Sequence, residues 1–220
     1  MPRAAVIIIP TTQESHAHAK VESSVKTRRD LYKESTRRGI LRAARRLFAE
    51  KGYSATTLVA VGRAAKVTTG ALYHHFKGKK DLFRAVAEGI EAEILERVGI
   101  ETQNIRDPWS KLELGISAML DICREPDIRR IVLLDAPNVI GGTEWREIEL
   151  RHGYGAMYQA LTALQTLGVI RSLPVNVLAP MLLGAMIEGA NSVAAAQDKA
   201  VALADAKQAI SLLLQGLRLR

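Results

Sequence analysis

Cysteine is almost absent from this 220-residue chain, which contains only Cys123. A single cysteine excludes an intramolecular disulfide and any metal site built from clustered cysteines, and it fits a reducing compartment such as the cytoplasm. The sequence has no run of 18 or more apolar residues, so we expect no membrane-spanning helix. The apolar run from Ala4 to Ile9 is too short for the core of a signal peptide and lacks a convincing cleavage site.

Strand-forming patterns are also scarce. Runs in which β-branched and polar residues alternate are nearly absent, whereas alanine and leucine are abundant and apolar residues recur at helical spacing. Aromatic residues make up only 5% of the chain and hydrophobic residues 48%, as in an ordinary globular protein. We therefore predict an all-α protein of about nine helices, without internal repeats.

Positive charge is concentrated in the first part of the chain. Residues 1–84 contain 18 Lys/Arg and 6 Asp/Glu, a net charge of +12, whereas residues 85–220 contain 13 and 17, a net charge of −4. This asymmetry is typical of a nucleic-acid-binding module joined to a neutral or acidic one. A basic arm that binds RNA or a membrane surface would give a similar division, so the choice between them depends on a more specific pattern.

That pattern lies between Thr56 and Phe83, where two short helices are predicted on either side of a tight turn, with a third helix starting just beyond. Thr57 and Thr68 can each cap a helix, because a threonine hydroxyl accepts a hydrogen bond from a backbone N–H two or three residues later. The second helix is apolar inside and rich in hydrogen-bond donors outside, as a helix in the DNA major groove must be. Its outward side carries Thr69, Tyr73, His74 and Lys77.

From Thr36 to Val86 the chain resembles the DNA-binding domain of the TetR family of bacterial repressors. The matching segments are TRRGILRAARRLFAEKGY, TTLVAVGRAAKV and TTGALYHHFKGKKDLFRAV. The resemblance implies a helix-turn-helix DNA-binding domain over residues 31–84 and an effector-binding and dimerisation domain over residues 85–220. It also implies the function of a sequence-specific repressor, bound to a palindromic operator as a homodimer and released by a small-molecule effector. The effector is unidentified and is expected to be apolar. No cofactor or membrane partner is expected.

The resemblance further implies a division of labour at the DNA. Phosphate contacts are expected from hydroxyl, ammonium and helix-start amide groups, and base contacts from the start and exposed face of the second helix. His75 is left open between a packing role and a phosphate contact. The predicted DNA-binding residues are Thr57, Lys66, Thr68, Thr69, Gly70, Tyr73, His74, Lys77 and Lys80.

Two residues depart from the family pattern. Lys66 occupies the turn where the family usually has glycine, and Gly62 stands where the family usually has alanine. A non-glycine residue at positive φ costs roughly 1 kcal/mol or more, and a glycine inside a helix costs ~0.5–1 kcal/mol. We therefore expect a less rigid motif than in most relatives, with Lys66 adding a positive charge beside the phosphates.

Residues 1–30 show no sustained periodicity and are expected to form a mobile N-terminal tail. Alternatively, Lys26, Arg28 and Arg29 form a basic arm that reaches a DNA minor groove. His16 and His18 have no further ligands nearby in the sequence, so no metal site is expected.

Apolar spacing, prolines and glycines predict where the helices begin and end. Gly52 should end the first helix, and Pro180 should start or kink a later one. Residues 138–143 are expected to be a flexible connection, because no strand precedes their paired glycines and no P-loop lysine follows them. The predicted helices cover residues 30 or 35–51, 58–65, 70–76, 81–98, 108–124, 127–134, 143–167, 174–196 and 201–217.

The last two helices contain many small residues, which allow helix axes to approach closely. They either pack within one subunit or pair with their copies in a four-helix dimer interface, which is the arrangement that the family resemblance implies. A dimer is also needed for DNA reading, because two half-sites lie about 34–36 Å apart on the duplex. The residues expected at the interface are Leu178, Leu182, Ala185, Met186, Gly189, Val193, Ile210, Leu213, Leu214 and Leu217.

The family resemblance also implies that a small molecule binds among the helices of the second domain. Aromatic, sulfur-containing and polar side chains could supply the walls and polar groups of such a pocket. Glu149 and His152 are spaced i, i+3 on one predicted helix and either position a ligand or hydrogen-bond each other. The candidate ligand-binding residues are Trp109, Met119, Cys123, Trp145, Glu149, His152, Tyr154 and Met157.

Two other functions compete with the repressor hypothesis. The first is a DNA-binding protein without an effector, such as an activator or an architectural protein. A screen for ligands that raise the melting temperature and release DNA would separate the two. The second is an enzyme, in which Cys123, Glu149 and His152 would have to combine into an acid–base or nucleophilic site. No nucleophile motif, glycine-rich cofactor loop or metal-ligand spacing supports it, so we expect no enzymatic activity.

Overall fold

The computed structural model describes residues 27–219, and within that range the chain is helical apart from its connections and one isolated β-bridge between Ile170 and Arg218. The prediction of an all-α fold is confirmed. The helices are α1 (Arg28–Ala55), α2 (Leu58–Ala65), α3 (Thr69–His75), α4 (Lys79–Thr102), α5 (Pro108–Ile122), α6 (Pro126–Ile128), the π-helical segment η1 (Arg129–Asp135), α7 (Ala136–Ile140), α8 (Gly142–Arg151), α9 (Gly153–Thr166), α10 (Val175–Ala195) and α11 (Lys199–Gln215).

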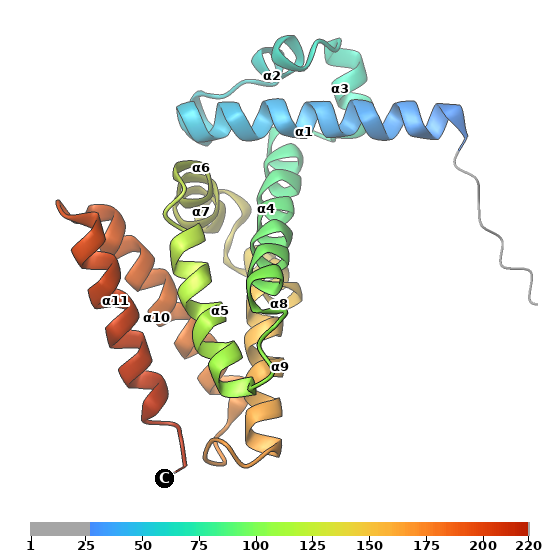
Figure 1. Ribbon diagram of the computed structural model, residues 1–220. Helices are drawn as coiled ribbons and strands as arrows, with labels where there is room; N and C mark the ends of the chain where they lie inside the picture. Colours follow the sequence, from blue (N-terminus) through green and yellow to red (C-terminus); the bar gives the residue numbers. More distant parts are fainter. Residues whose placement is uncertain (1–26, 220) are drawn as a thin grey trace, which may run out of the picture.

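Helix α4 joins the two parts of the molecule. Figure 1 shows α1 lying across one end, with α2 and α3 packed on its outer side, while α4 runs from this group down the length of the remaining helices. The first part is held together by the fully buried side chains of Phe48 and Phe83, whose rings meet edge to face at a centroid distance of 5.0 Å. Phe83 belongs to α4, so the helix that leads into the second part is also a core element of the first.

Helix α1 begins earlier than the sequence predicted, because Thr27 and Asp30 form a capping box. The Thr27 hydroxyl accepts from the backbone N–H of Asp30 at 3.2 Å, and the Asp30 carboxylate accepts from the backbone N–H of Thr27 at 3.2 Å. Arg28 and Arg29 are therefore helical residues rather than part of a tail. The rest of the predicted tail, including Lys26, His16 and His18, lies outside the described residues.

The two sites where the backbone adopts positive φ around α1 and α2 were both predicted. Gly52 has φ of 77° and interrupts α1 before its last residues. A Cβ on Gly52 would lie 2.3 Å from Nη2 of Arg130, the movable end of that side chain, so the positive φ is what favours glycine here. Lys66 ends α2 in the left-handed region at φ of 58°, as expected for a residue standing where glycine is usual.

Replacing Lys66 by glycine should stabilise the protein by about 0.5–1 kcal/mol, because glycine has no Cβ to strain this conformation. Urea unfolding monitored by circular dichroism measures the change. The matched control is Arg42→Gly at an exposed position inside α1, which should destabilise by about 1 kcal/mol. Equal destabilisation by the two changes would contradict the strained turn.

The second part of the chain differs from its predicted boundaries in two places. Residues 143–167 form two helices rather than one, broken at His152. Gly155 permits the break, since a Cβ there would lie 2.5 Å from the backbone oxygen of Leu150. Residues 126–140 form a continuous helical run through η1, so the predicted end at Leu134 and most of the predicted flexible connection are wrong. Pro137 lies at the start of α7, directly after the π-helical segment η1, where the regular helical hydrogen-bond pattern is interrupted.

Helix α10 is long and apolar enough, by length and composition alone, to cross a membrane. The same test is passed by core helices of globular proteins, and α10 packs along α9 and α11. Pro180 lies inside α10, which begins at Val175 after Pro174, so Pro180 does not start the helix.

The two parts are tied together by ion pairs at the junction of α1, α4 and α6. Nε of Arg45 on α1 lies 2.8 Å from Oδ2 of Asp127, and the same guanidinium pairs with Glu93 on α4. Arg45 is half-buried, and its ion pairs fix the orientation of α1 relative to the second part.

Candidate DNA-binding surface and effector cavity

Helix α3 is positioned by its caps. The Thr68 hydroxyl accepts from the backbone N–H of Ala71 at 3.1 Å, and the Thr57 hydroxyl accepts from that of Ala60 at the start of α2 at 3.2 Å. Leu72 is fully buried and anchors α3 to the core, so the opposite side of this short helix faces outward. Each capping hydroxyl still has its own O–H available as a donor.

All nine residues predicted to bind DNA are solvent-exposed. Those on α3 present hydroxyl, imidazole and phenol groups on its outer face, with Tyr73 56% exposed. His75 is half-buried between the rings of His74 and Phe76, and burial lowers the pKa of its imidazole, with smaller contributions from nearby cations. A neutral imidazole is a weaker phosphate partner than a charged one, so this environment favours the packing role of His75.

The two consecutive lysines at the start of α4 have different surroundings. Nζ of Lys79 donates to the backbone oxygens of Tyr53 at 2.9 Å, Ser54 at 3.2 Å and Thr56 at 3.0 Å, and it lies 4.3 Å from the centroid of the Tyr53 ring. Lys79 therefore holds the end of α1, a role that the sequence prediction missed. Lys80 is exposed and available to DNA.

Lys80 also contacts the second part of the chain. Its Nζ lies 3.5 Å from Oε2 of Glu144 on α8, and Nε of Arg84 lies 2.9 Å from Oε1 of the same residue. A predicted phosphate contact is thus paired with a carboxylate on a helix that lines the cavity described next.

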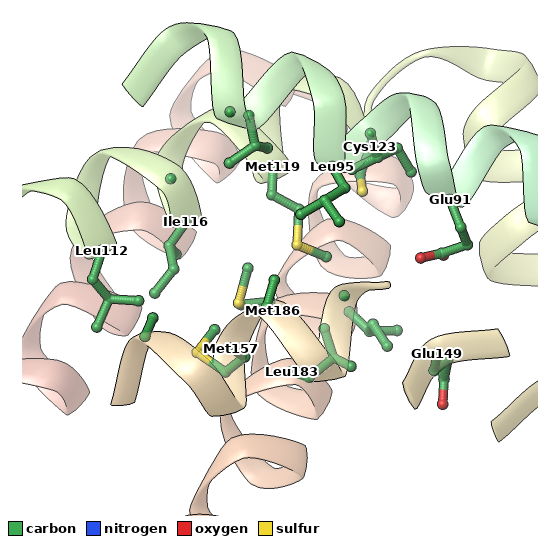
Figure 2. A pocket seen from close by; sticks show the side chains of 18 of the residues that line it. Glu91, Leu95, Leu112, Ile116, Met119, Cys123, Glu149, Met157, Leu183 and Met186 are labelled. Carbon is green, nitrogen blue, oxygen red and sulfur yellow. The ribbon is translucent and has the colours of Figure 1, made fainter. Parts of the chain in front are cut away.

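A cavity of about 650 Å³ lies among α4, α5, η1, α7, α8, α9 and α10. Figure 2 shows that its middle is occupied by the sulfur-containing side chains of Met119, Met157 and Met186, while Glu91 and Glu149 lie toward one end. Most of the wall is apolar. Such a cavity can enclose a small organic molecule and contact it mainly through hydrocarbon and sulfur atoms.

Five of the eight predicted ligand-binding residues line this cavity, namely Met119, Cys123, Trp145, Glu149 and Met157. The other three do not, because each packs elsewhere. Trp109 is buried, and the Arg218 guanidinium lies 5.1 Å from its ring centroid. The Arg146 guanidinium lies 4.7 Å from the centroid of the Tyr154 ring. Nε2 of His152 lies 4.0 Å from Oε1 of Glu88.

The combination of Cys123, Glu149 and His152 into one reactive site is therefore not formed. Cys123 and Glu149 line the cavity, whereas His152 does not. Burial raises the pKa of the Cys123 thiol to about 12, with further contributions from Glu91 and Glu125, so the thiol is protonated at neutral pH and is a poor nucleophile.

The sequence prediction missed Glu91, the acidic residue of α4 that lines the cavity. Burial raises the pKa of its carboxyl to about 7, and the nearby Glu149 contributes in the same direction. Its surrounding sequence, GIEAEILER, has the alternation of acidic and apolar residues that an ordinary exposed helix also has. No local signal separates Glu91 from its exposed neighbours.

The residues predicted at a dimer interface need correction. Leu182, Met186, Val193, Ile210 and Leu214 are buried within the single chain, and Met186 lines the cavity, so these five cannot face a partner. Leu178, Ala185, Gly189 and Leu217 are half-buried, and Leu213 is exposed. The most apolar sides of α10 and α11 pack inward because they complete the core with α5 and α9.

A second, less continuous apolar surface remains on the outside of these two helices. We call it the outer face of α10 and α11. It is interrupted by polar residues such as Glu188 and Gln208, which explains why periodicity did not identify it. Its large exposed members are Val177, Met181, Val201, Leu212 and Leu213.

A helix-turn-helix module carried by a helical domain with an internal cavity defines a DNA-binding regulator. Two family profiles match the chain: "Bacterial regulatory proteins, tetR family" over residues 40–86, and "Tetracyclin repressor-like, C-terminal domain" over residues 109–217.

Individual proteins agree with these matches. The Transposon Tn10 TetC protein of Escherichia coli is 30% identical over 150 residues, covering 68% of this chain and 76% of that protein. The HTH-type transcriptional repressor BepR of Brucella suis biovar 1 is 43% identical over 101 residues, 44% of this chain and 47% of BepR. The crystal structure of a TetR-family transcriptional regulator from Pectobacterium atrosepticum is 35% identical, with a TM-score of 0.73 over 88% of this chain and 98% of that one. The chain belongs to the TetR family of transcriptional regulators.

Proposed function

We propose that this protein is a cytoplasmic repressor that binds a palindromic operator as a homodimer and is released when a small molecule occupies the cavity. The observation that carries the proposal is α3, a capped helix whose exposed side consists of hydrogen-bond donors. Its predicted base readers are Thr69, Gly70 and His74, flanked by the cationic Lys77 and Lys80. The relative BepR is a transcriptional repressor by name, which supports repression over activation.

The route from cavity to DNA runs through α8 and the start of α4. Trp145 and Glu149 line the cavity, and Glu144 on the same helix pairs with Lys80 and Arg84. An effector that moves α8 would therefore move or release the lysine expected at a phosphate. Such a ligand acts only if it binds the DNA-incompetent conformation more tightly than the competent one.

Selection of bound fragments from random DNA tests the proposal directly, because it yields half-site, spacing and symmetry together. Two copies of one half-site in inverted orientation are the expected result. Recovery of DNA without a common motif would contradict sequence-specific operator binding.

Substitutions on the selected operator should separate base reading from phosphate contact. His74→Ala should cost about 1–3 kcal/mol on the operator and little on scrambled DNA, since a base contact distinguishes sequences. Lys80→Ala should weaken binding to both DNAs alike and reduce the slope of log K against log salt concentration by about one. Fluorescence anisotropy titrations at several salt concentrations measure both effects. Equal loss on both DNAs for His74→Ala would contradict its assignment as a base reader.

We propose no enzymatic activity for the protein. Cys123 lines the cavity but carries a protonated thiol, and His152 contacts Glu88 outside the cavity, so we expect neither to act as a nucleophile or base on a cavity ligand. Regulation of DNA binding accounts for the cavity without a chemical step.

A further inference from the structure

The carboxyl group of Glu91 has no partner in a cavity that is otherwise mostly apolar. Within residues 27–219, no hydrogen bond or ion pair joins it to another side chain or to the backbone, and Figure 2 shows it directed into the cavity. Its Oε2 lies over Gly153 at the start of α9, where an added Cβ would be 3.7 Å away. Glu91 is half-buried, and a carboxyl group without a protein partner in a mostly apolar cavity is costly to the fold, so its presence points to a ligand that satisfies it.

The charges near Glu91 favour a positively charged ligand. Glu149 on α8 lies close enough to raise the pKa of Glu91, and its own carboxylate is 3.3 Å from Nη1 of Arg146. Arg146 is thus occupied by Glu149 and by the Tyr154 ring. The one Lys or Arg among the lining residues is Lys111, in the first turn of α5 and four residues before Gly115, where an added Cβ would lie 3.7 Å from Cγ2 of Thr102 at the end of α4. Thr102 is 11 residues beyond Glu91, about 16 Å along the helix.

We infer that the cavity binds an apolar molecule with one positively charged nitrogen, placed against Glu91, with its body among Met119, Met157 and Met186. The inference rests on the proposed role of the cavity as the effector site. Three methionines offer a polarizable surface that adapts to flat aromatic groups. The effector is therefore a hydrophobic amine or a related organic cation rather than a neutral or anionic compound.

Cation binding should depend on pH with a defined sign. Because the pKa of Glu91 is raised to about 7, the empty cavity holds a partly protonated acid at neutral pH, and a bound cation favours the ionised form. Affinity for a permanently charged ligand should therefore fall as pH decreases through 7. The titratable groups facing Glu91 are Glu149 from α8 and Cys123 from α5, whose thiol stays neutral. His152 lies outside the cavity lining, and η1, α7 and α10 supply apolar residues.

Three fluorescent probes with the same body test the charge preference: 1-pyrenemethylamine, 1-pyrenemethanol and 1-pyrenecarboxylate. Titrations of the full chain at pH 8, without DNA, should give affinities for the amine about 10–100-fold above the alcohol, as expected for a hydrogen-bonded charge pair. The carboxylate should bind most weakly. In Glu91→Gln the advantage of the amine should disappear while the affinity for the alcohol stays within about threefold.

The matched control is Glu96→Gln, because Glu96 lies on the same helix at an exposed position outside the cavity lining. It should keep the preference for the amine. A wild-type protein that binds the alcohol or the carboxylate as tightly as the amine would overturn the inference, even if Glu91→Gln failed to fold. An unchanged preference in Glu91→Gln would overturn it too.

The pH arm uses the permanently charged probe N,N,N-trimethyl-1-pyrenemethanaminium. Its affinity should fall between pH 8 and pH 6 in the wild type and stay constant in Glu91→Gln; a constant wild-type affinity would count against Glu91 as its partner. Release of operator DNA by the amine is measured separately. If the cavity prefers the cation but DNA is not released, the inferred cation site stands and the proposed effector role is contradicted. If a neutral compound releases DNA, the effector role stands and the inferred preference for a cation is contradicted.

Discussion

Replacing Leu212 by glutamate should convert the protein from a dimer into a monomer and lower its affinity for a full operator by at least about 100-fold. Leu212 is 60% exposed in the single chain and lies on the outer face of α10 and α11. A glutamate at this position in a dimer would have to be buried without a partner, which costs several kcal/mol on the scale of unpaired buried charges. The monomer would retain one recognition helix and lose the second half-site.

The outer face is suited to self-association by its composition and its position. Val177, Met181 and Gly184 recur at spacings of four and three residues on one exposed side of α10. Figure 1 shows α10 and α11 side by side at one edge of the molecule, with α11 on the side far from α4. Two copies of this pair would form a four-helix interface and leave both α3 helices free for DNA.

The control is Leu167→Glu, because Leu167 is 61% exposed but lies just after α9, outside the outer face. Sedimentation equilibrium at micromolar concentration and operator titrations should leave this variant like the wild type. A dimeric Leu212→Glu protein with unchanged operator affinity would show that subunits associate through another surface. A monomeric wild type would contradict the proposed dimer.

The helix-turn-helix could be predicted from the sequence because its determinants are local. Thr57 and Thr68 cap helices within three residues of themselves, and Lys66 ends α2 at the position where a reversal was expected. The second helix was expected to be apolar inside, and Leu72 is the buried residue of α3. Each of these features depends on residues close together in the chain, which is the range over which sequence patterns are informative.

The residues of the dimer face and of the cavity lining could not be predicted as fully, because both sets depend on which side of a helix packs against another helix. Leu182 and Leu214 have the most regular apolar spacing on their helices, and for that reason they pack inside the chain. Glu91 lines a cavity only because α4 packs against α5, α8 and α9. The break at His152 had a signal in Gly153 and Gly155, but two glycines near a helical pattern do not identify a close backbone contact.

Lys79→Met should destabilise the protein by about 2–4 kcal/mol, although the lysine is only one residue away from an exposed DNA-contact candidate. Three charge-assisted hydrogen bonds to backbone oxygens and one cation–π contact would be lost, each with a net value of about 0.5–3 kcal/mol and not fully additive. The carbonyls of Tyr53 and Thr56 lie where α1 ends and the chain turns into α2. Methionine keeps most of the length and apolar stem of the side chain, so the change isolates the ammonium group.

Lys80→Met is the matched control, because it removes the same group from the next residue. Its ion pair with Glu144 is exposed, and such pairs contribute about 0–1 kcal/mol. Urea unfolding should therefore show a large loss of stability for Lys79→Met and almost none for Lys80→Met, while DNA titrations of the folded proteins at low temperature should weaken most for Lys80→Met. If Lys79→Met unfolded at the wild-type urea concentration, the end of α1 would not depend on this ammonium. The orientation of α2 and α3 would then be set by apolar packing, including the burial of Leu72 and the contact between Phe48 and Phe83.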